Sequence, residues 1–211
     1  MKIFQDKISS AVSRVRIALA LKGLDVEVKT VLILGPDAQN HSPEYRRINP
    51  QGLVPALLTD EGALLTQSMA IFEYLEERYR DPALLPKDLV ARAQARAIAL
   101  AITSEIHALL PPRVAAKLAT LPGIGPTQIS EWKHHWITSG MSAVETLLSG
   151  HDGHLFAVSD SPTVADIFLF PQAINAERAG IDLGQWPRTA AIIKRLRDIP
   201  AFAVNAPAPA S

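Results

Sequence analysis

The sequence predicts two domains, an α/β domain followed by an all-helical one. In residues 1–80, strand-like segments rich in β-branched residues alternate with helix-like segments. The segment Asp81–Pro86 then contains two prolines, which prevent a continuous helix. Beyond it every long segment has helical character, with Gly and Pro between the segments. We therefore place an α/β domain at residues 1–81 and a helical domain at residues 88–204.

The predicted order in the first domain is β-α-β, a loop with one helical turn, and then β-β-α. Gly23 follows the first helix as a left-handed C-cap, and the turn Thr59–Gly62 joins the last two strands. An antiparallel hairpin added to a βαβ unit gives a mixed sheet with helices on its faces. We expect strands at Lys2–Gln5, Val26–Ile33, Val54–Leu58 and Ala63–Leu65, and helices at Ser13–Lys22 and Gln67–Tyr79.

The second domain is predicted to contain four long helices. A capping box, in which Thr163 and Asp166 satisfy N-terminal amides reciprocally, begins the third of them, so we interpret Asp166 as structural. The Pro- and Ala-rich tail at residues 205–211 is expected to fray. The four helices are expected at Leu89–Leu110, Pro126–Ser149, Thr163–Ala179 and Trp186–Arg197.

Composition argues against several classes of function. Lys+Arg and Asp+Glu each number 21 in the 211 residues, so the chain lacks the basic character of a nucleic-acid binder. The chain has no cysteine, which excludes disulfides, thiolate metal sites and a cysteine nucleophile, and we expect no metal centre. Neither a signal peptide nor an apolar run of about 18 residues is apparent, so we expect a cytoplasmic protein without a membrane partner.

A pair of serines, Ser9 and Ser10, stands between the first strand and the first helix. Backbone N–H groups at a helix N-terminus lack partners within the helix and carry partial positive charge. A hydroxyl beside them can donate to an anion such as a thiolate. Lowering a thiol pKa of about 8.5 by about two units corresponds to roughly 2.7 kcal/mol, which one donor and a helix end can supply. The alternative is that the serine is only a helix N-cap.

Two further segments have features of a site for an extended, peptide-like ligand. Pro55 stands just inside a predicted strand, where it cannot donate to the sheet. If the Val54–Pro55 bond is cis, the Val54 backbone N–H and C=O turn away from the sheet; the alternative is a trans proline on an edge strand. Gln67 and Ser68 begin the next helix, whose free N–H groups and serine hydroxyl can bind a carboxylate or simply form a cap.

The order and spacing of these segments resemble those of a known family. The similarity extends from about Met1 to Phe202 and is carried by SSAVSRVRIALALKGLDVE, NPQGLVPALLTDEGALLTQSMAIFEYLEERY and SPTVADIFLFPQAINAERAGIDL. On these residues the chain resembles the zeta-class glutathione transferases, and more narrowly the maleylacetoacetate and maleylpyruvate isomerases. The resemblance implies the glutathione transferase fold, with a thioredoxin-like glutathione-binding domain and an all-helical substrate-binding domain. It also implies a homodimer with glutathione as cosubstrate.

The resemblance further implies an activity, the cis–trans isomerisation of maleyl-type diacids (maleylacetoacetate or maleylpyruvate) in aromatic catabolism. In that reaction a glutathione thiolate adds to the double bond, the central bond rotates and the thiolate leaves. Arginine suits such substrates because it binds carboxylates in two-point contacts. The implied catalytic residues are Ser9, Ser10 and Arg178, the implied glutathione-binding residues are Gln51, Val54, Pro55, Gln67 and Ser68, and the implied substrate-binding residues are His107, Arg113 and Arg178.

Without the resemblance, the sequence favours solvated surface charges for the two arginines and a packed helix histidine for His107. The chain also departs from the family pattern. Ile8 stands where the isomerases usually carry arginine, Ser13 where an aromatic residue is common, and Ala11 where many relatives have cysteine. The pair Pro111-Pro112 replaces an expected Asn-Leu, and we expect it to kink a helix or to cost about 3 kcal/mol.

These departures keep two alternatives open. One is a glutathione transferase, lyase or dehalogenase that acts on a different electrophile, larger or less acidic than a maleyl diacid. The other is a non-catalytic, transferase-like binding protein, against which the retention of Ser9, Ser10, Gln67 and Ser68 argues.

Overall fold

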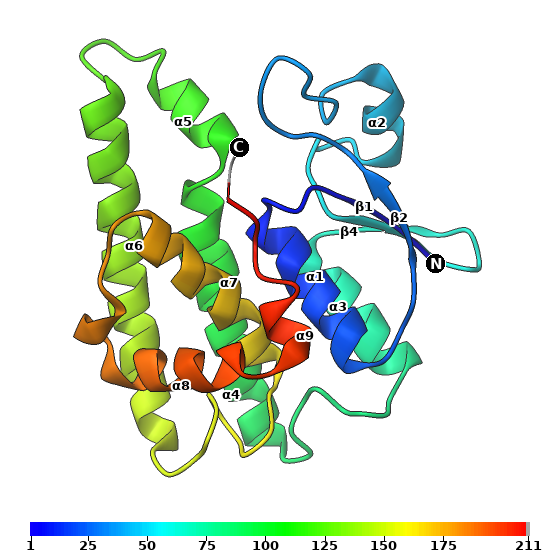
Figure 1. The fold of residues 1–211 in the computed structure, drawn as a ribbon, viewed down its shortest axis with the longest axis vertical. Helices are drawn as coiled ribbons and strands as arrows, with labels where there is room; N and C mark the ends of the chain where they lie inside the picture. Colours follow the sequence, from blue (N-terminus) through cyan, green and yellow to red (C-terminus); the bar gives the residue numbers. More distant parts are fainter. Residues whose placement is uncertain (210–211) are drawn as a thin grey trace. The chain divides into compact units, whose positions relative to one another are not determined.

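Figure 1 shows the computed structural model of the protein, which describes residues 1–209. Internal contacts divide the chain into two compact units, Met1–Leu84 together with Ala201–Ser211, and Leu85–Pro200. The division falls within the proline-containing segment Asp81–Pro86. Residues 201–204, which the sequence places in the helical domain, group with the first unit instead.

The first unit is built on a mixed four-stranded sheet with the order β2-β1-β3-β4. Strand β1 pairs in parallel with β2 and antiparallel with β3, and β3 continues into the hairpin with β4. Side chains alternate across a strand, so Ile3 is fully buried on one face while Phe4 contacts Tyr45 on the other, with ring centroids 6.2 Å apart. The predicted mixed sheet is confirmed. The strands are β1 Lys2–Gln5, β2 Glu27–Thr30, β3 Ala56–Leu58 and β4 Leu64–Thr66.

Three helices cover this sheet, and α1 and α3 pack against each other. Helix α2 lies on the other side of the sheet (Figure 1). Its Tyr45 ring contacts Phe4 there. A buried ion pair joins the C-terminal end of α1 to α3, because Lys22 Nζ lies 2.7 Å from a carboxylate oxygen of Glu76. The bounds are α1 Ser10–Leu21, α2 Pro43–Ile48 and α3 Ser68–Arg78, and the short helix α9 spans Pro200–Ala203.

The second unit is helical, and no strand occurs between residues 85 and 200, all of which the structure describes. Helix α7 forms its centre: 11 of its 15 residues are buried, and it packs against α4, α6 and α8. The bounds are α4 Leu89–Leu100, π-helix η1 Ala101–Ile106, 3₁₀-helix η2 His107–Leu109, α5 Pro112–Leu118, α6 Pro126–Leu148, 3₁₀-helix η3 Ser149–His151, α7 Val164–Arg178, 3₁₀-helix η4 Leu183–Gln185 and α8 Pro187–Arg197.

The predicted continuous helix Leu89–Leu110 is wrong in detail. The α-helix ends at Leu100 and passes through a π-helical turn and a short 3₁₀ turn before Pro111. The predicted kink at the proline pair is also wrong. Pro111 stands before α5 and Pro112 occupies its first turn, where the missing N–H costs nothing.

The predicted capping box at the start of α7 is confirmed. The Asp166 carboxylate accepts from Thr163 N at 2.8 Å, Thr163 Oγ1 at 3.0 Å and Ala157 N at 2.9 Å. Asp166 is fully buried, and burial raises its pKa to about 6 although these donors oppose the shift. Asp166 therefore fixes the N-terminus of the central helix.

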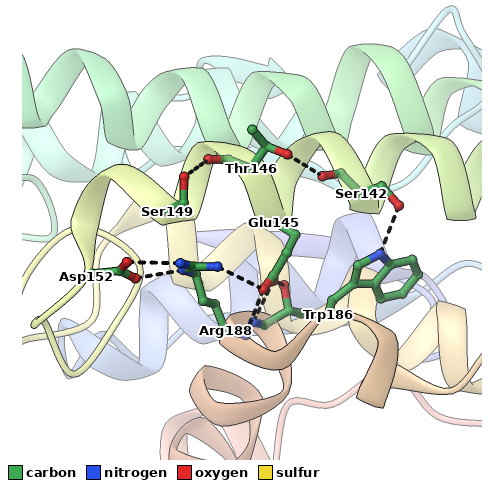
Figure 2. A network of polar contacts seen from close by, with 8 residues as sticks. Ser142, Glu145, Thr146, Ser149, Asp152, Trp186 and Arg188 are labelled. Atoms are coloured by element: carbon green, nitrogen blue, oxygen red, sulfur yellow. Dashed lines mark hydrogen bonds and ion pairs between the residues drawn. The ribbon is translucent and has the colours of Figure 1, made fainter.

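A second polar network holds α8 to α6 (Figure 2). The Glu145 carboxylate on α6 accepts from the backbone N–H groups of Arg188 at 2.8 Å and Thr189 at 2.9 Å, so one helix caps the next. The Arg188 guanidinium forms a two-point pair with Asp152, with N···O distances of 2.7 and 2.9 Å. Among the helices of residues 1–209, none has the length and apolarity that crossing a bilayer requires.

Candidate active site

The loop between β1 and α1 carries the two serines. Ser9 is the N-cap of α1, with extended backbone angles (φ −78°, ψ 120°), and its Oγ accepts from Val12 N at 3.3 Å. Ser10 is the first residue of the helix and is only 5 % exposed. A hydroxyl oxygen that accepts one hydrogen bond still has its own hydrogen to donate. The capping role of Ser9 is therefore compatible with donation to an anion at this helix end.

Asp6 holds this loop from the strand side. Its carboxylate accepts from Ile8 N at 3.3 Å and from Ile33 N at 3.1 Å, and its carbonyl accepts from Ser9 N at 3.0 Å. These bonds fix the backbone on both sides of Ile8, the residue that stands in place of the expected arginine. The position of Ile8 in the loop is therefore set by backbone hydrogen bonds, and its side chain brings no charge to the site.

The Val54–Pro55 peptide bond is cis, as the resemblance implies. The ladder between β1 and β3 ends at the pair Phe4–Ala56, so the backbone of Val54 lies outside the sheet pairing. The preceding carbonyl, that of Leu53, accepts from Tyr45 Oη and Asn49 Nδ2, both at 2.7 Å. Burial raises the Tyr45 pKa, which keeps the phenol protonated as a donor.

Gly52 allows the loop before Val54 to pack closely against the backbone of Asn40. It has φ +63°, and a Cβ there would lie 2.8 Å from the carbonyl oxygen of Asn40. The Asn40 side-chain amide in turn donates to the Gly52 carbonyl at 2.8 Å. The backbone before Val54 is therefore held from both sides, and Val54 itself lies outside the β1–β3 pairing.

Gln67 and Gln51 come together from separate loops. Gln67 Nε2 donates to Gln51 Oε1 at 2.7 Å, and both side chains are exposed. Gln67 has φ +70°, the one non-glycine residue of the described chain in the left-handed region. Such a conformation persists only where the surroundings impose it, and it is common at ligand-binding positions.

Ser68, the first residue of α3, contacts an arginine that sequence reasoning missed. Arg14 Nη1 lies 3.5 Å from Ser68 Oγ, and the Arg14 guanidinium is almost completely buried. Burial lowers the Arg14 pKa to about 9, so the group remains charged at neutral pH. The sequence signal was the spacing of Arg14 with Ile17 and Ala18 on the buried face of α1. A buried cation and a helix N-terminus both favour an anion near Ser68.

The three residues predicted to bind the substrate lie in the second unit, on three separate elements. His107 begins η2, directly after the π-helical turn, and the same 3₁₀ turn is fixed by a hydrogen bond of 2.9 Å from Trp132 Nε1 to the Leu109 carbonyl. Arg113 follows Pro112 in the first turn of α5 and is exposed. Arg178 is the last residue of α7, and partial burial lowers its pKa. π-helical turns are frequent at functional sites, which makes the position of His107 notable.

Comparison with known proteins identifies the family. Residues 8–78 match the family model described as glutathione S-transferase, N-terminal domain. The maleylacetoacetate isomerase of Pseudomonas aeruginosa is 43 % identical over 212 residues, covering 99 % of this chain and 96 % of the relative. The chain belongs to the maleylacetoacetate isomerase family of zeta-class glutathione transferases.

Two solved structures of this family are similar to the chain over nearly its whole length. A bacterial maleylpyruvate isomerase of the zeta class, in its holo form, has a TM-score of 0.92 and 35 % identity and covers 98 % of this chain and 97 % of its own. The maleylacetoacetate isomerase of Methylobacterium extorquens AM1, with bound malonate and glutathione, has a TM-score of 0.92 and 35 % identity, with complete coverage of both chains. The glutathione transferase fold and glutathione as cosubstrate are thus confirmed for this zeta-class chain.

The residues of the first unit fit glutathione as a ligand. The Val54 backbone lies outside the sheet pairing, where a peptide can pair with it. Ser68 and the N-terminus of α3 offer hydrogen-bond donors next to the buried Arg14. Ser9 caps the N-terminus of α1, which favours a thiolate. In the described chain no group of three or more His, Cys, Asp or Glu side chains could hold a metal ion.

Proposed function

We propose that the protein is a glutathione-dependent cis–trans isomerase of maleyl-type diacids, maleylacetoacetate or maleylpyruvate, in the catabolism of aromatic compounds. The observation that carries the proposal is the serine pair at the N-terminus of α1, retained within a chain that belongs to this isomerase family over almost its full length. Bound glutathione supplies a thiol whose ionised form adds reversibly to an activated double bond.

In the first unit, Ser9 or Ser10 donates a hydrogen bond toward the glutathione sulfur, and the α1 N-terminus favours the negative charge. The backbone of Val54, beside the cis bond to Pro55, pairs with the main chain of the tripeptide. Gln51, Gln67 and Ser68 bind its γ-glutamyl end, where the free N–H groups of α3 meet a carboxylate. We assign this role to a domain comprising residues 1–81.

We assign substrate binding to a domain comprising residues 88–204, of which residues 88–200 lie in the second unit. Arg178 and Arg113 provide positive charge for the carboxylates of the substrate, and His107 provides a further donor. The malonate bound to the Methylobacterium relative supports an acidic ligand, since malonate is a small dicarboxylate. Arg178 is exposed at the end of α7, so we expect its charge to act on an anion through partly screened contacts.

We also propose that the protein works as a cytoplasmic homodimer. Leu89 and Val90 at the start of α4 are 79 % and 64 % exposed, a large apolar exposure for adjacent residues. Light scattering coupled to gel filtration measures the assembly, and a monomer at micromolar concentration would contradict the dimer.

The isomerase activity is tested by following the cis isomer of maleylacetoacetate or maleylpyruvate by proton NMR. We expect its conversion to the trans isomer to require both the protein and glutathione. S-methylglutathione, which has no free thiol, is the matched control and should give no conversion. A rate no higher than that with glutathione alone would contradict isomerisation.

A second candidate is transfer, elimination or dehalogenation on another electrophile by the same thiol. Ile8 and the proline pair at Pro111 favour it, because they remove a cation and an amide expected for binding a diacid. Turnover of neutral or halogenated electrophiles in the absence of maleyl isomerisation would support this candidate.

A further inference from the structure

We propose that the C-terminal segment Asn205–Ala208 is a positioning element for the loop that carries Ser9. The proposal rests on the proposed function only in giving Ser9 its role beside the glutathione thiol. We call the segment the C-terminal strap. The sequence predicts that this tail frays, and the structure corrects that prediction, since Asn205 is 6 % exposed and Pro207 is buried. Residues 210 and 211 of the predicted frayed tail lie outside the described residues.

The first contact of the strap is with the first turns of α1. Ser13 Oγ donates to the Asn205 carbonyl at 2.6 Å, and the Ser13 side chain is 2 % exposed. The backbone N–H of the same serine donates to the Ser9 carbonyl at 3.0 Å. Ser13 thus connects the strap directly to the N-cap residue. It stands at a position where an aromatic residue, which has no comparable short donor, was expected.

The second contact lies on the other side of Ser9. The Ala208 backbone N–H donates to the Lys7 carbonyl at 2.8 Å. Lys7 precedes Ser9 by two residues and Ser13 follows it by four, so the strap binds the chain on both sides of the serine. Figure 1 shows the C-terminal segment (red) beside the N-terminal end of α1 (blue).

The strap is itself fixed at its beginning. Phe202 is fully buried, and the Asn205 backbone N–H donates to the Phe202 carbonyl at 3.2 Å. The Asn205 side-chain amide donates to the Ala201 carbonyl at 2.8 Å, which orients the residue whose own carbonyl receives Ser13. An anchored strap can transmit position to the loop, whereas a loose tail could not.

The position of Ser9 matters because hydrogen bonds to a reacting group depend steeply on distance and angle. A displacement of about 1 Å at a catalytic group can reduce a rate by about 10²-fold. Precise sites are held by a surrounding shell of packed and hydrogen-bonded groups. For Ser9 that shell comprises Asp6, whose carbonyl accepts from Ser9 N, and the strap, which binds Lys7 before the serine and Ser13 after it.

Two strap variants and two matched controls test the strap. Ser13→Ala removes the first contact, and a chain ending at Ala206 removes the second. A chain ending at Pro209 is the matched truncation, because it keeps both contacts. Thr189→Val is the matched hydroxyl control, since Thr189 is also fully buried and its Oγ1 also donates a hydrogen bond, to Glu145 at 2.8 Å in the second unit.

The first measurement is hydrogen–deuterium exchange of residues 7–13 in the ligand-free protein. We expect Ser13→Ala and the chain ending at Ala206 to exchange at least about 10-fold faster there, and both controls to exchange like the wild type. Unchanged exchange in both variants would overturn the strap. This measurement needs no glutathione, so it remains informative if the proposed function fails.

The second measurement is the pKa of the bound glutathione thiol, read from thiolate absorbance. We expect both strap variants to raise it by about one unit, a tenfold loss of thiolate, while S-methylglutathione binds within about twofold of wild type. Faster exchange with an unchanged thiol pKa would overturn the positioning role. Failure of the wild type to bind glutathione would refute the proposed function instead.

Discussion

The residues proposed to hold glutathione and those proposed to hold the substrate differ in how the fold supports them. In the first unit, Ser10, Val54, Pro55 and Ser68 are buried, and their neighbours are held by Asp6, Tyr45, Asn49 and Arg14. In the second unit, His107 is half-buried, and Arg113 and Arg178 are exposed at the start of one helix and the end of another. Apart from the half-buried Ser9 and the exposed Gln51 and Gln67, the residues proposed to hold glutathione thus lie in buried, hydrogen-bonded segments, whereas those proposed to hold the substrate are side chains at the ends of elements.

The largest effect we expect is on the stability of the second unit, through the capping box of its central helix. Asp166→Ala leaves the N–H groups of Thr163 and Ala157 without their acceptor in a fully buried place, which should lower the free energy of unfolding by about 3–4 kcal/mol. Asp182→Ala is the control, because Asp182 also caps a helix but does so at the surface, and should cost less than about 1 kcal/mol. If urea unfolding shows equal losses of unfolding free energy in both variants, the stability of the second unit does not depend on the capping box.

The same carboxyl predicts a pH dependence. Burial raises the Asp166 pKa from 3.8 to about 6, so between these values the native state holds a proton that the unfolded state has released. This stabilising contribution is complete below about pH 4 and is lost as the pH rises to about 6. Asp166→Asn has no such titration, so its free energy of unfolding should decline less than that of the wild type over this range. Parallel curves would contradict the raised pKa.

The next largest effect we expect is on the turnover rate, through the serine pair proposed to activate the thiol. Ser9→Ala should lower kcat by about 100-fold, because it removes one donor to a developing or resident anion, with glutathione affinity changed by no more than about threefold. Ser42→Ala is a close control, since Ser42 caps α2 and accepts from Tyr45 N in the same way as Ser9 caps α1. If Ser10→Ala causes the loss and Ser9→Ala does not, the two serines exchange roles.

Ser68→Ala tests whether the first unit binds the γ-glutamyl carboxylate beside Arg14. We expect glutathione to bind about 20-fold more weakly by calorimetry, which corresponds to a hydrogen bond to a charged group. An analogue in which 4-aminobutyrate replaces the γ-glutamyl residue lacks that carboxylate. It should bind wild type and variant alike, and an equal loss for the analogue would place Ser68 elsewhere in the site.

The smallest effect is expected in the second unit, where charge acts from an exposed position. Arg178→Ala should reduce kcat/KM for an acidic maleyl substrate by about tenfold and that for a neutral electrophile by less than about twofold. Arg197→Ala removes a comparable charge that pairs with Glu177 and should change neither. Equal losses on acidic and neutral substrates would show that Arg178 does not act through its charge.

Local sequence patterns predicted most of the helices and strands, and also the segments that carry the family resemblance. Strand β1 and the capping box at Thr163 match their predictions, because both depend on neighbouring residues alone. Helix α1 begins at Ser10, three residues before the predicted start at Ser13, since Ser9 serves as its N-cap. The sequence did not predict helix α5, because a proline pair is expected to kink a helix, although proline favours the first turn.

Long-range contacts could not be predicted in this way. The Ser13–Asn205 hydrogen bond joins residues 192 apart, and nothing in an Ala- and Pro-rich tail indicates a buried partner. The contact of Arg14 with Ser68 likewise joins two helices, and helical spacing shows only that Arg14 shares a face with apolar residues. The sequence thus predicted the segments proposed to bind glutathione, but not the long-range contacts that support them.

Ionisation of bound glutathione most directly tests whether the first unit activates the thiol. Thiolate absorbance near 240 nm is titrated with pH in the complex with the wild-type protein. We expect half-ionisation at least one pH unit below the value of about 8.5 for a free thiol, because the α1 N-terminus and a serine hydroxyl both favour the anion. A bound thiol that titrates at the free value would contradict this role for the serine pair.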